Sequence, residues 1–358
     1  MAFEHLLSAW DGEEVLVHFD RSSGAWMFIC LHSMTLGPAA GGTRLRAYAS
    51  PEEGLADGLR LSEGMTWKAV VGGLPHGGGK GVIAVREVPR GDERTRLLVQ
   101  YAGLVNVLGG NFRTGPDMNI TQEDVDLIAE QTPYIFGRSP SAGGSGSSGP
   151  DTAIGVMHGI RASLAHAFGP EDLEGRVVLI QGVGGVGETL AHLLAEEGAT
   201  VMVSDPAEER VRVLVKRLGI EAVAPDKAIE TECDVFSPCA IGGVLNAESI
   251  PKLRCRVVAG SANNQLGSAD DAERLRVAGI LYAPDYVINV GGGLHLYGLE
   301  QLGWDRGTLE RHLAGIGETL AEIFAISDRD GITTVAAAEQ IGFERLARAR
   351  RASTGSAS

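Results

Sequence analysis

The sequence has few cysteines, no long apolar run and more acidic than basic side chains. Its four cysteines form neither a C-x-x-C pair nor a zinc spacing with histidine. The N-terminus lacks the basic start and apolar run of a signal peptide, and no segment is apolar for long enough to span a membrane. A formal net charge of −15 disfavours a nucleic-acid partner and an anionic membrane surface. These absences predict a cytoplasmic protein that binds no metal, nucleic acid or membrane.

Two patterns divide the chain of 358 residues, which is long enough for two domains. A stretch dense in glycine, serine and proline covers residues 137–151 and is typical of a linker. After it, short apolar runs at 176–181 and 200–205 alternate with helical patterns such as 207–219. Alternating strands and helices predict a parallel sheet with right-handed crossovers.

The residues before the linker indicate a separate α/β unit. Strand-like alternation covers 14–20 and 25–33, and helical periodicity covers 50–71 and 93–109. We therefore expect an N-terminal α/β domain and a C-terminal Rossmann-type domain. The expected boundaries are 1–136 for the first and 137–330 for the second, with a helical stretch at about 330–350 packing back on the first and a flexible tail at 351–358.

The motif with the clearest chemistry is GVGGVG at 182–187, which directly follows an apolar strand and opens a helix. Gly182 permits the tight turn, Gly184 lets the backbone approach a pyrophosphate, and Gly187 lets the helix pack closely on the strand. The helix N-terminus adds positive potential. This context indicates a dinucleotide site rather than glycines that only shape a turn.

Asp205 ends the next strand, where its carboxylate can accept hydrogen bonds from a ribose 2′-hydroxyl. The same charge repels a 2′-phosphate, which favours NAD over NADP, although Arg210 lies nearby and weakens that preference.

A second glycine-rich stretch, GLPHGGGKG at 73–81, ends in Lys80. It is not a P-loop, because Leu74 and Gly81 occupy the positions that need a glycine and a hydroxyl. We interpret it as a loop whose glycines let Lys80 approach a small anionic substrate, with Lys68 as a fixed charge for a carboxylate. A like charge and burial would lower the pKa of Lys80, so that it could exchange protons with Asp117. The alternative is that both lysines lie on the surface and Asp117 is a turn residue.

Seven motifs occur in an order that resembles one family. They are GPAAGGTR, GLPHGGGKG, TGPDMN, GVGGVG, DVFSPCA followed by GG, AGSANNQ and APDYVINVGGG, between residues 37 and 293. The chain resembles the glutamate, leucine, phenylalanine and valine dehydrogenases over nearly its whole length. The resemblance implies reversible NAD-dependent oxidative deamination of an L-amino acid, an active-site cleft between the two domains, and a homo-oligomer.

The resemblance also implies residue roles. Lys80 is then the catalytic lysine, Asp117 shuttles protons, and Lys68 binds the substrate carboxylate. The other residues implied at the substrate are Ala40, Gly41, Gly42, Met65, Asn263 and Leu296. Those implied at the cofactor or in holding the cleft are Arg44, Thr152, Gly182, Gly184, Gly185, Val186, Gly187, Asp205, Arg210, Cys239, Ala240, Gly260, Asn263, Asn264 and Asn289.

Two positions bear on the substrate side chain. Glutamate-specific relatives carry a lysine and a serine where this chain has Ala40 and Leu296, so a buried distal carboxylate would be unpaired. Leucine-type relatives resemble GPALGG, with a leucine where Ala40 leaves room for a ring. The expected substrate is therefore L-phenylalanine, with leucine or valine as the alternative.

Two other functions stay open at this point. An NAD-binding sensor without turnover would be expected to lack Lys80 or Asp117, and both are present. A 2-hydroxy acid dehydrogenase commonly relies on a histidine paired with a carboxylate. Here lysines dominate, and the only histidines in the motifs or in the run 293–304 that follows them are His76 and His295.

Overall fold

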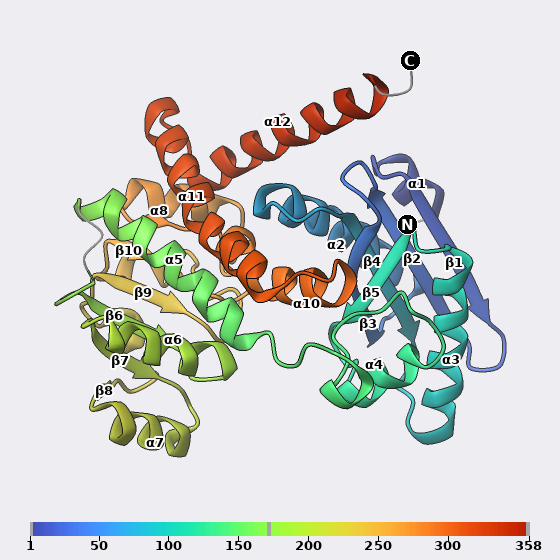
Figure 1. Ribbon diagram of the computed structural model, residues 1–358, viewed down its shortest axis with the longest axis horizontal. Helices are drawn as coiled ribbons and strands as arrows, with labels where there is room; N and C mark the ends of the chain where they lie inside the picture. Colours follow the sequence, from blue (N-terminus) through green and yellow to red (C-terminus); the bar gives the residue numbers. More distant parts are fainter. Residues whose placement is uncertain (1–2, 170–172, 356–358) are drawn as a thin grey trace. The chain divides into compact units, whose positions relative to one another are not determined.

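The chain folds as two compact α/β units in a computed structural model that describes residues 3–169 and 173–355 (Figure 1). Unit 1 comprises the chain up to Gly146, the short segment Leu299–Gly303, and the chain from Gly342 onward. Unit 2 comprises Ser147–Gly298 and Trp304–Ile341. The polypeptide thus passes between the two units four times.

Unit 1 is built on a five-stranded mixed sheet with the order β1-β2-β4-β3-β5. Strands β1, β2 and β4 pair antiparallel, while β3 runs parallel to both β4 and β5. The strands are β1 (Glu14–Asp20), β2 (Ala25–Ser33), β3 (Ala39–Ala47), β4 (Gly77–Val85) and β5 (Phe112–Pro116).

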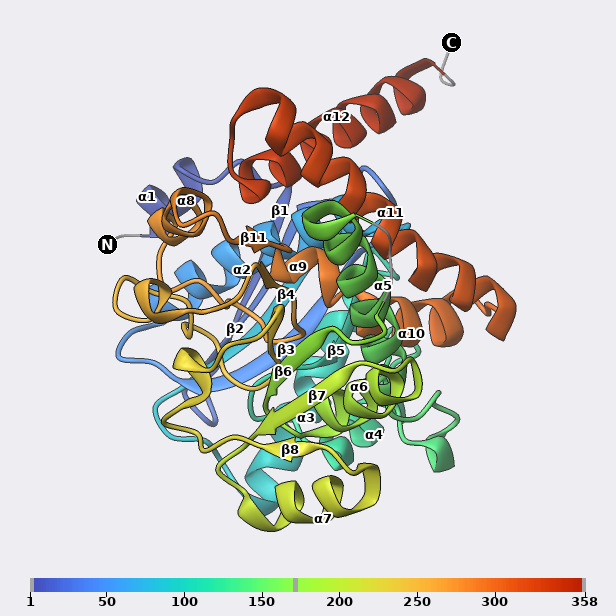
Figure 2. The same cartoon turned by 90° about the vertical axis from the view of Figure 1, so that its left-hand side faces the viewer.

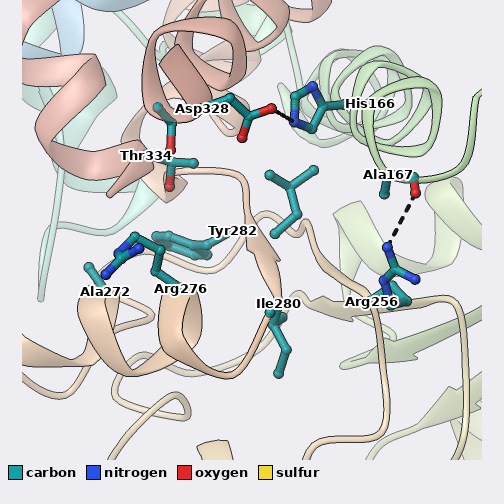
Figure 3. Close-up of a pocket in the computed structure, with 12 residues that line it drawn as sticks. His166, Ala167, Arg256, Ala272, Arg276, Ile280, Tyr282, Asp328 and Thr334 are labelled. Carbon is teal, nitrogen blue, oxygen red and sulfur yellow. Dashed lines mark hydrogen bonds and ion pairs between the residues drawn. The ribbon is translucent and has the colours of Figure 1, made fainter. Parts of the chain in front are cut away.

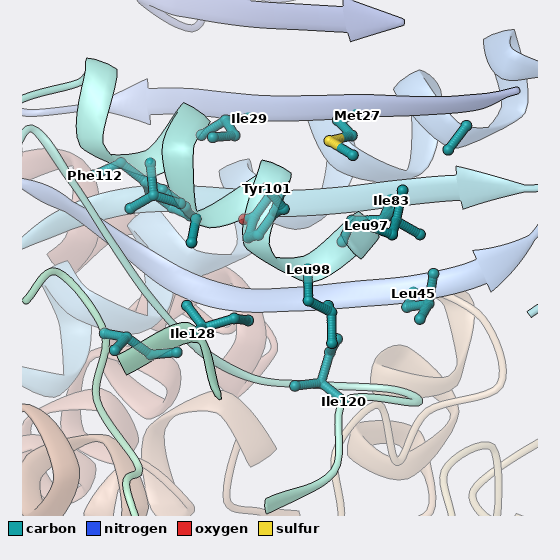
Figure 4. Close-up of a cluster of buried hydrophobic side chains, with 14 of the residues drawn as sticks. Met27, Ile29, Leu45, Ile83, Leu97, Leu98, Tyr101, Phe112, Ile120 and Ile128 are labelled. Carbon is teal, nitrogen blue, oxygen red and sulfur yellow. The ribbon is translucent and has the colours of Figure 1, made fainter. Parts of the chain in front are cut away.

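Helices cover both faces of this sheet, because alternate residues of its central strands are apolar on either side. On one face α2 (Pro51–Gly72) packs on Phe28 and Val82. On the other, α3 (Gly91–Val107) and α4 (Gln122–Ala129) enclose the cluster drawn in Figure 4, with Tyr101 at its centre. Unit 1 also contains two short elements, α1 (Phe3–Ser8) and the 3₁₀ turn η1 (Pro140–Ala142), the second of which lies within the predicted linker.

The glycine run and Lys80 of the GLPHGGGKG stretch lie in a strand, so the interpretation of this part as a loop is wrong. Gly77–Val85 form β4, which is hydrogen-bonded on both sides and fully buried. Neighbouring side chains occupy the space that larger residues would need. A β-carbon at Gly78 would lie 2.0 Å from Thr66 Oγ1, one at Gly79 2.9 Å from the ring of Phe112, and one at Gly81 2.0 Å from Tyr101 Oη. Glycine weakens an exposed strand, but here side chains packed on both faces stabilise β4.

Unit 2 is a Rossmann-type fold with a six-stranded parallel sheet in the order β11-β10-β9-β6-β7-β8. Figure 2 shows three of these strands, β6, β7 and β8, side by side. The order reverses between β6 and β9, which is the point where such sheets bind dinucleotides. The strands are β6 (Val177–Gln181), β7 (Thr200–Ser204), β8 (Glu221–Ala222), β9 (Val235–Pro238), β10 (Val257–Val258) and β11 (Leu281–Tyr282).

Helices and short turns connect these strands and cover the sheet. Leu179 and Phe236 point into the apolar cluster beneath α8, whereas Ile180 faces α6. The helices are α5 (Gly149–Phe168), α6 (Gly185–Glu196), α7 (Glu208–Leu218), α8 (Asp270–Val277), α9 (Asp285–Ile288), α10 (Gly291–Gln301), α11 (Arg306–Asp330) and α12 (Thr334–Gly355), with 3₁₀ turns η2 (Ala228–Glu230) and η3 (Ile250–Lys252).

The C-terminal helix α12 begins in unit 2 and ends in unit 1. Arg345 donates to the carbonyl oxygen of Val71 at 2.8 Å, and the rings of Phe343 and Trp67 meet edge to face. The helix continues to Gly355, five residues into the segment for which the sequence predicts a tail, and residues 356–358 lie outside the described part. Among residues 3–169 and 173–355, no helix is both long and apolar enough to cross a bilayer.

Candidate active site

Lys80, which is buried, and Asp117, which is half-buried, form an ion pair in unit 1. Nζ of Lys80, on β4, lies 2.5 Å from Oδ2 of Asp117, which follows β5, and the two side chains are 7% and 25% exposed. Desolvation lowers the pKa of Lys80 below its ordinary value, although Asp117 opposes this. Burial alone would raise the pKa of Asp117, but Lys80 and then Arg44 lower it, so the carboxylate is ionised at neutral pH. A lysine that is less basic than usual, beside an ionised carboxylate, is suited to proton transfer.

The glycine pair of β3 lets the neighbouring backbone approach this pair. A β-carbon at Gly41 would lie 1.9 Å from the carbonyl oxygen of Gly79, and one at Gly42 would lie 2.9 Å from Cβ of Asp117. Both contacts are closer than real side chains tolerate, so only glycine permits them. The sequence-predicted residues Gly41 and Gly42 thus contribute space rather than a functional group.

Arg44 lies on the same strand, and its guanidinium contacts two carboxylates of unit 1. Nε donates to Oδ2 of Asp117 at 3.1 Å, and Nη1 donates to Oδ2 of Asp57 at 2.9 Å. The sequence predicts a role for Arg44 at the cofactor or in holding the cleft, whereas the contacts observed here are to Asp57 and Asp117.

Four further substrate-site candidates lie on two helices and one strand. Lys68 and Met65 are on α2, both half-buried, and Leu296 is half-buried on α10 of unit 2. Ala40 is buried at 1% exposure, in register with Gly78 and Arg113.

His76 precedes β4 and is buried. Desolvation lowers its pKa to about 4, against a hydrogen bond between Nδ1 and the carbonyl oxygen of Gly77 at 2.7 Å. The ring is therefore neutral at physiological pH, which does not suit a proton donor in a hydroxy acid dehydrogenase.

In unit 2, the glycine motif lies where the strand order reverses. Gly182 follows β6 with a φ of 104°, and a β-carbon there would lie 2.7 Å from that of Ala240, in the loop after β9. A β-carbon at Gly187 would lie 1.9 Å from the carbonyl oxygen of Gly182. A β-carbon added at Gly184 or Gly185 would have no atom of a non-neighbouring residue within 4 Å. No side chain caps the N-terminus of α6 either. Open space at a helix N-terminus that no side chain caps fits a pyrophosphate.

Asp205 follows β7, next to this motif. Its Oδ2 accepts the amide of Val183 at 2.9 Å, and its Oδ1 accepts the amide of Ala207 at 2.8 Å. Burial alone would raise the pKa of Asp205, but these amides lower it below its ordinary value. Nη2 of Arg210 lies 3.4 Å from Oδ1. The fixed carboxylate fits the ribose of NAD.

Most of the other cofactor candidates also follow the carboxyl ends of strands. Nδ2 of Asn289 donates to Oδ1 of Asn263 at 2.8 Å, and the amide of Asn264, with a φ of 52°, donates to Asp285. Gly260 packs against Pro238, and Cys239 donates its amide to the carbonyl oxygen of Gln181 at 2.7 Å. Val186 is half-buried in the first turn of α6.

Thr152 lies on α5 rather than after a strand. Its Oγ1 donates to the carbonyl oxygen of Ser148 at 2.8 Å and would lie 3.0 Å from a β-carbon at Gly292.

Two buried polar clusters have no counterpart in the sequence-based prediction. In unit 1, Thr43 Oγ1 lies 2.6 Å from Tyr101 Oη and 2.5 Å from Thr114 Oγ1, beside β4. In unit 2, Asp151 contacts His295 Nδ1 at 2.5 Å and Arg306 Nη2 at 2.6 Å. No local motif reveals either cluster, because partners such as Asp151 and His295 are far apart in sequence.

A pocket of about 280 Å³ on unit 2 lies away from these residues (Figure 3). Arg256 and Ile280 line it and directly precede β10 and β11, so it is at the amino ends of the strands rather than at the edge with the glycine motif. Its His166 pairs with Asp328 at 3.1 Å. Within the described ranges there is no group of three or more histidine, cysteine or acidic side chains that could hold a metal ion.

Comparisons with known proteins agree with this arrangement. A family model described as Glu/Leu/Phe/Val dehydrogenase, dimerisation domain, matches residues 15–138, and one described as Glutamate/Leucine/Phenylalanine/Valine dehydrogenase matches residues 207–354. Residues 176–236 also match a model of F420-dependent NADP oxidoreductases.

Full-length relatives give the same result. Leucine dehydrogenase of Thermoactinomyces intermedius is 42% identical over 96% of this chain and 93% of its own length. Valine dehydrogenase of Streptomyces virginiae is 42% identical over 94% of each chain. The crystal structure of L-tryptophan dehydrogenase from Nostoc punctiforme superposes with a TM-score of 0.87 at 36% identity, covering 98% of this chain and all of that one. The resemblance seen in the motifs is confirmed: the chain belongs to the Glu/Leu/Phe/Val dehydrogenase family and is an NAD-dependent amino acid dehydrogenase.

Proposed function

We propose that the protein catalyses reversible oxidative deamination of a branched-chain L-amino acid, leucine or valine, to the 2-oxo acid and ammonia. The observation that carries the reaction is the ion pair between the buried Lys80 and the half-buried Asp117, whose Nζ and Oδ2 atoms lie 2.5 Å apart. The substrate class is supported by leucine and valine dehydrogenases that are each 42% identical over more than nine-tenths of the chain. These relatives favour the aliphatic alternative over the phenylalanine preference inferred from Ala40.

The proposed roles follow from charge and position. Lys68 holds the substrate α-carboxylate as a point charge. Asp117 accepts a proton from the substrate ammonium, so that the amine can support loss of hydride from Cα. The glycine motif and Asp205 would hold NAD⁺, which would supply the hydride acceptor. Lys80 then assists the addition of water to the resulting iminium, and the carbinolamine releases ammonia and the 2-oxo acid.

A substrate panel tests the proposal. NADH formation is measured by its absorbance with leucine, valine, isoleucine, phenylalanine, tryptophan and glutamate, and with the corresponding 2-hydroxy acids. We expect the highest kcat/KM with leucine or valine and none with hydroxy acids. Turnover of hydroxy acids alone, or of no compound in the panel, would contradict the proposed reaction.

An aromatic substrate is the second candidate. It is supported by the small side chain of Ala40 and by the similarity to a tryptophan dehydrogenase structure. If Ala40 sets the room for the substrate side chain, Ala40→Leu should lower kcat/KM for phenylalanine relative to valine. An unchanged ratio would remove Ala40 from the argument.

We also propose that the protein is a homo-oligomer. The model matching residues 15–138 is described as a dimerisation domain, and the edge strand β1 exposes Val17 and Phe19 at 42% and 41%. Light scattering on the eluting protein tests this proposal, and a monomer at micromolar concentration would contradict it.

A further inference from the structure

Arg44 is held between two acidic side chains on different elements of unit 1. Its Nε contacts Asp117 at 3.1 Å and its Nη1 contacts Asp57, on α2, at 2.9 Å. The side chains of Arg44 and Asp57 are only 14% and 13% exposed, so solvent screens these contacts weakly. A planar guanidinium bound on two sides has little freedom to rotate, and it fixes the carboxylate that it contacts.

Asp57 is itself held by two further residues. Tyr48 Oη donates to its Oδ2 at 2.7 Å, and Arg60 Nη2 donates to its Oδ1 at 2.8 Å. Arg60 is 65% exposed and contacts Oδ1 of Asp57, whereas Arg44 contacts Oδ2. The connection from α2 to the candidate catalytic pair therefore passes through Oδ2 of Asp57 and the guanidinium of Arg44.

The same residues set the charge near Lys80. Burial is the largest influence on the pKa of Lys80 and lowers it, whereas the charge of Asp117 raises it. The positive charge of Arg44 lowers this pKa further, and the negative charge of Asp57 raises it. Asp57 thus offsets part of the effect of Arg44 on the lysine.

We propose that Asp57, acting through Arg44, is a positioning residue that fixes Asp117 beside Lys80 and balances the charge around this lysine. The inference rests on the proposed deamination for the roles of Lys80 and Asp117. It gives Arg44 a function in unit 1, in place of contact with the cofactor.

Other charged or titratable groups near Lys80 are left unchanged by the test. On β2, Cys30 is in register with Lys80, and burial raises its pKa to about 12, so the thiol is neutral. His32, on the same strand, contacts Thr66 and Asp11. Lys68 lies on α2. Since none of these residues is altered, differences between variants report on Arg44 and Asp57.

Arg44→Lys tests positioning. The variant keeps the charge, but a single ammonium on a flexible stem cannot reproduce the two-sided contact. We expect kcat for leucine or valine to fall by roughly 10- to 100-fold, as for an ångström-scale misplacement of a reacting group, with KM for NAD⁺ and its dissociation constant unchanged. A weakened affinity for NAD⁺ with normal kcat would instead place Arg44 at the cofactor and overturn the proposal.

Asp57→Asn and Arg44→Gln test the charge balance, because they must act in opposite directions. If Lys80 works in its neutral form, activity rises with pH as this lysine loses its proton. Asp57→Asn leaves the charge of Arg44 uncompensated, so the acidic limb of the pH profile of kcat/KM moves to lower pH. Arg44→Gln removes that charge, so the limb moves to higher pH. Purely structural damage would not give opposite shifts, and shifts of equal sign or no shift would refute the inference.

The matched control is Arg60→Gln, which removes the positive charge that contacts Oδ1 of Asp57. We expect less than a threefold change in kcat and an unshifted pH profile. A shift of the pH profile as large as that of Asp57→Asn would show that general disruption around Asp57 explains the result.

A second measurement separates this inference from the proposed reaction. The rate at which acetic anhydride acetylates Lys80 is followed against pH by peptide mass spectrometry, without substrate. Opposite shifts of the Lys80 titration in Asp57→Asn and Arg44→Gln would support the charge balance even if no amino acid were turned over. Wild-type deamination with unshifted titrations would leave the reaction standing and reject the inference.

Discussion

Asp117 packs directly against Gly42 of β3, so replacing this glycine by alanine should displace the carboxylate. The new β-carbon would lie 2.6 Å from the carbonyl oxygen of Pro116 and 2.9 Å from Cβ of Asp117. Ordinary contact begins near 3.4 Å, so the segment carrying Asp117 must retreat by roughly 0.8 Å. A displacement of this size in a reacting group lowers the rate by on the order of 100-fold, or about 2.7 kcal/mol of transition-state stabilisation.

The measurement is kcat and KM for the best amino acid, with NAD⁺ affinity determined by fluorescence and folding checked by thermal unfolding. We expect kcat to fall sharply while NAD⁺ affinity is retained, because unit 2 is unchanged. Gly64→Ala is the matched control, since it lies on α2 with nothing within 4 Å of the new β-carbon. It should keep full activity and stabilise the helix by about 0.5–1 kcal/mol. If Gly42→Ala retained more than half of the wild-type kcat, the link between this close contact and catalysis would be wrong.

Three further predictions concern stability and cofactor choice. Gly81→Ala should lower the free energy of unfolding by about 1–3 kcal/mol, because its β-carbon would lie 2.0 Å from Tyr101 Oη. Urea titration measures this loss, and adding Tyr101→Phe should recover part of it. Asp205→Asn should raise the ratio of kcat/KM for NADP⁺ to that for NAD⁺ by roughly tenfold, since the charge that repels a 2′-phosphate is removed, and an unchanged ratio would argue against the assigned role. Burial alone would raise the pKa of Asp124, but its contacts with Arg94 at 2.8 and 2.5 Å lower this pKa. The contribution of Asp124 to the free energy of unfolding is therefore present above the unfolded pKa of about 3.9, and it is lost as pH falls through the lower folded pKa. Asp124→Asn should therefore destabilise the fold by about 1–3 kcal/mol at pH 7 but not in strong acid, and an equal loss at both pH values would contradict this account.

The sequence was most informative where one short motif contains all the residues that the local backbone geometry requires. GVGGVG follows a strand and opens α6, because the tight turn and the close helix packing each demand glycine at fixed spacing. It was least informative at β4, where three consecutive glycines argue for a loop by propensity, and only tertiary packing by Thr66, Phe112 and Tyr101 makes them a strand.

The connection between Arg44 and Asp57 was beyond sequence reasoning for a different reason. The two residues are on β3 and α2, and neither belongs to a local pattern that predicts a pair. Ala40 illustrates the same limit for specificity: its size can be read from the sequence, but whether the substrate meets it depends on its surroundings.

The four passages of the chain between its units limit how this protein could be cut or recombined. A fragment ending at Gly146 would lack Glu300, which accepts the amides of Gly137 and Ser145 at 3.0 Å, and Arg345, which donates to Val71. These partners lie in segments encoded more than 150 codons downstream of Gly146. Exchange of the first unit between two relatives through a single crossover would therefore separate these hydrogen-bond partners, and a functional chimera would need all three segments from the same parent.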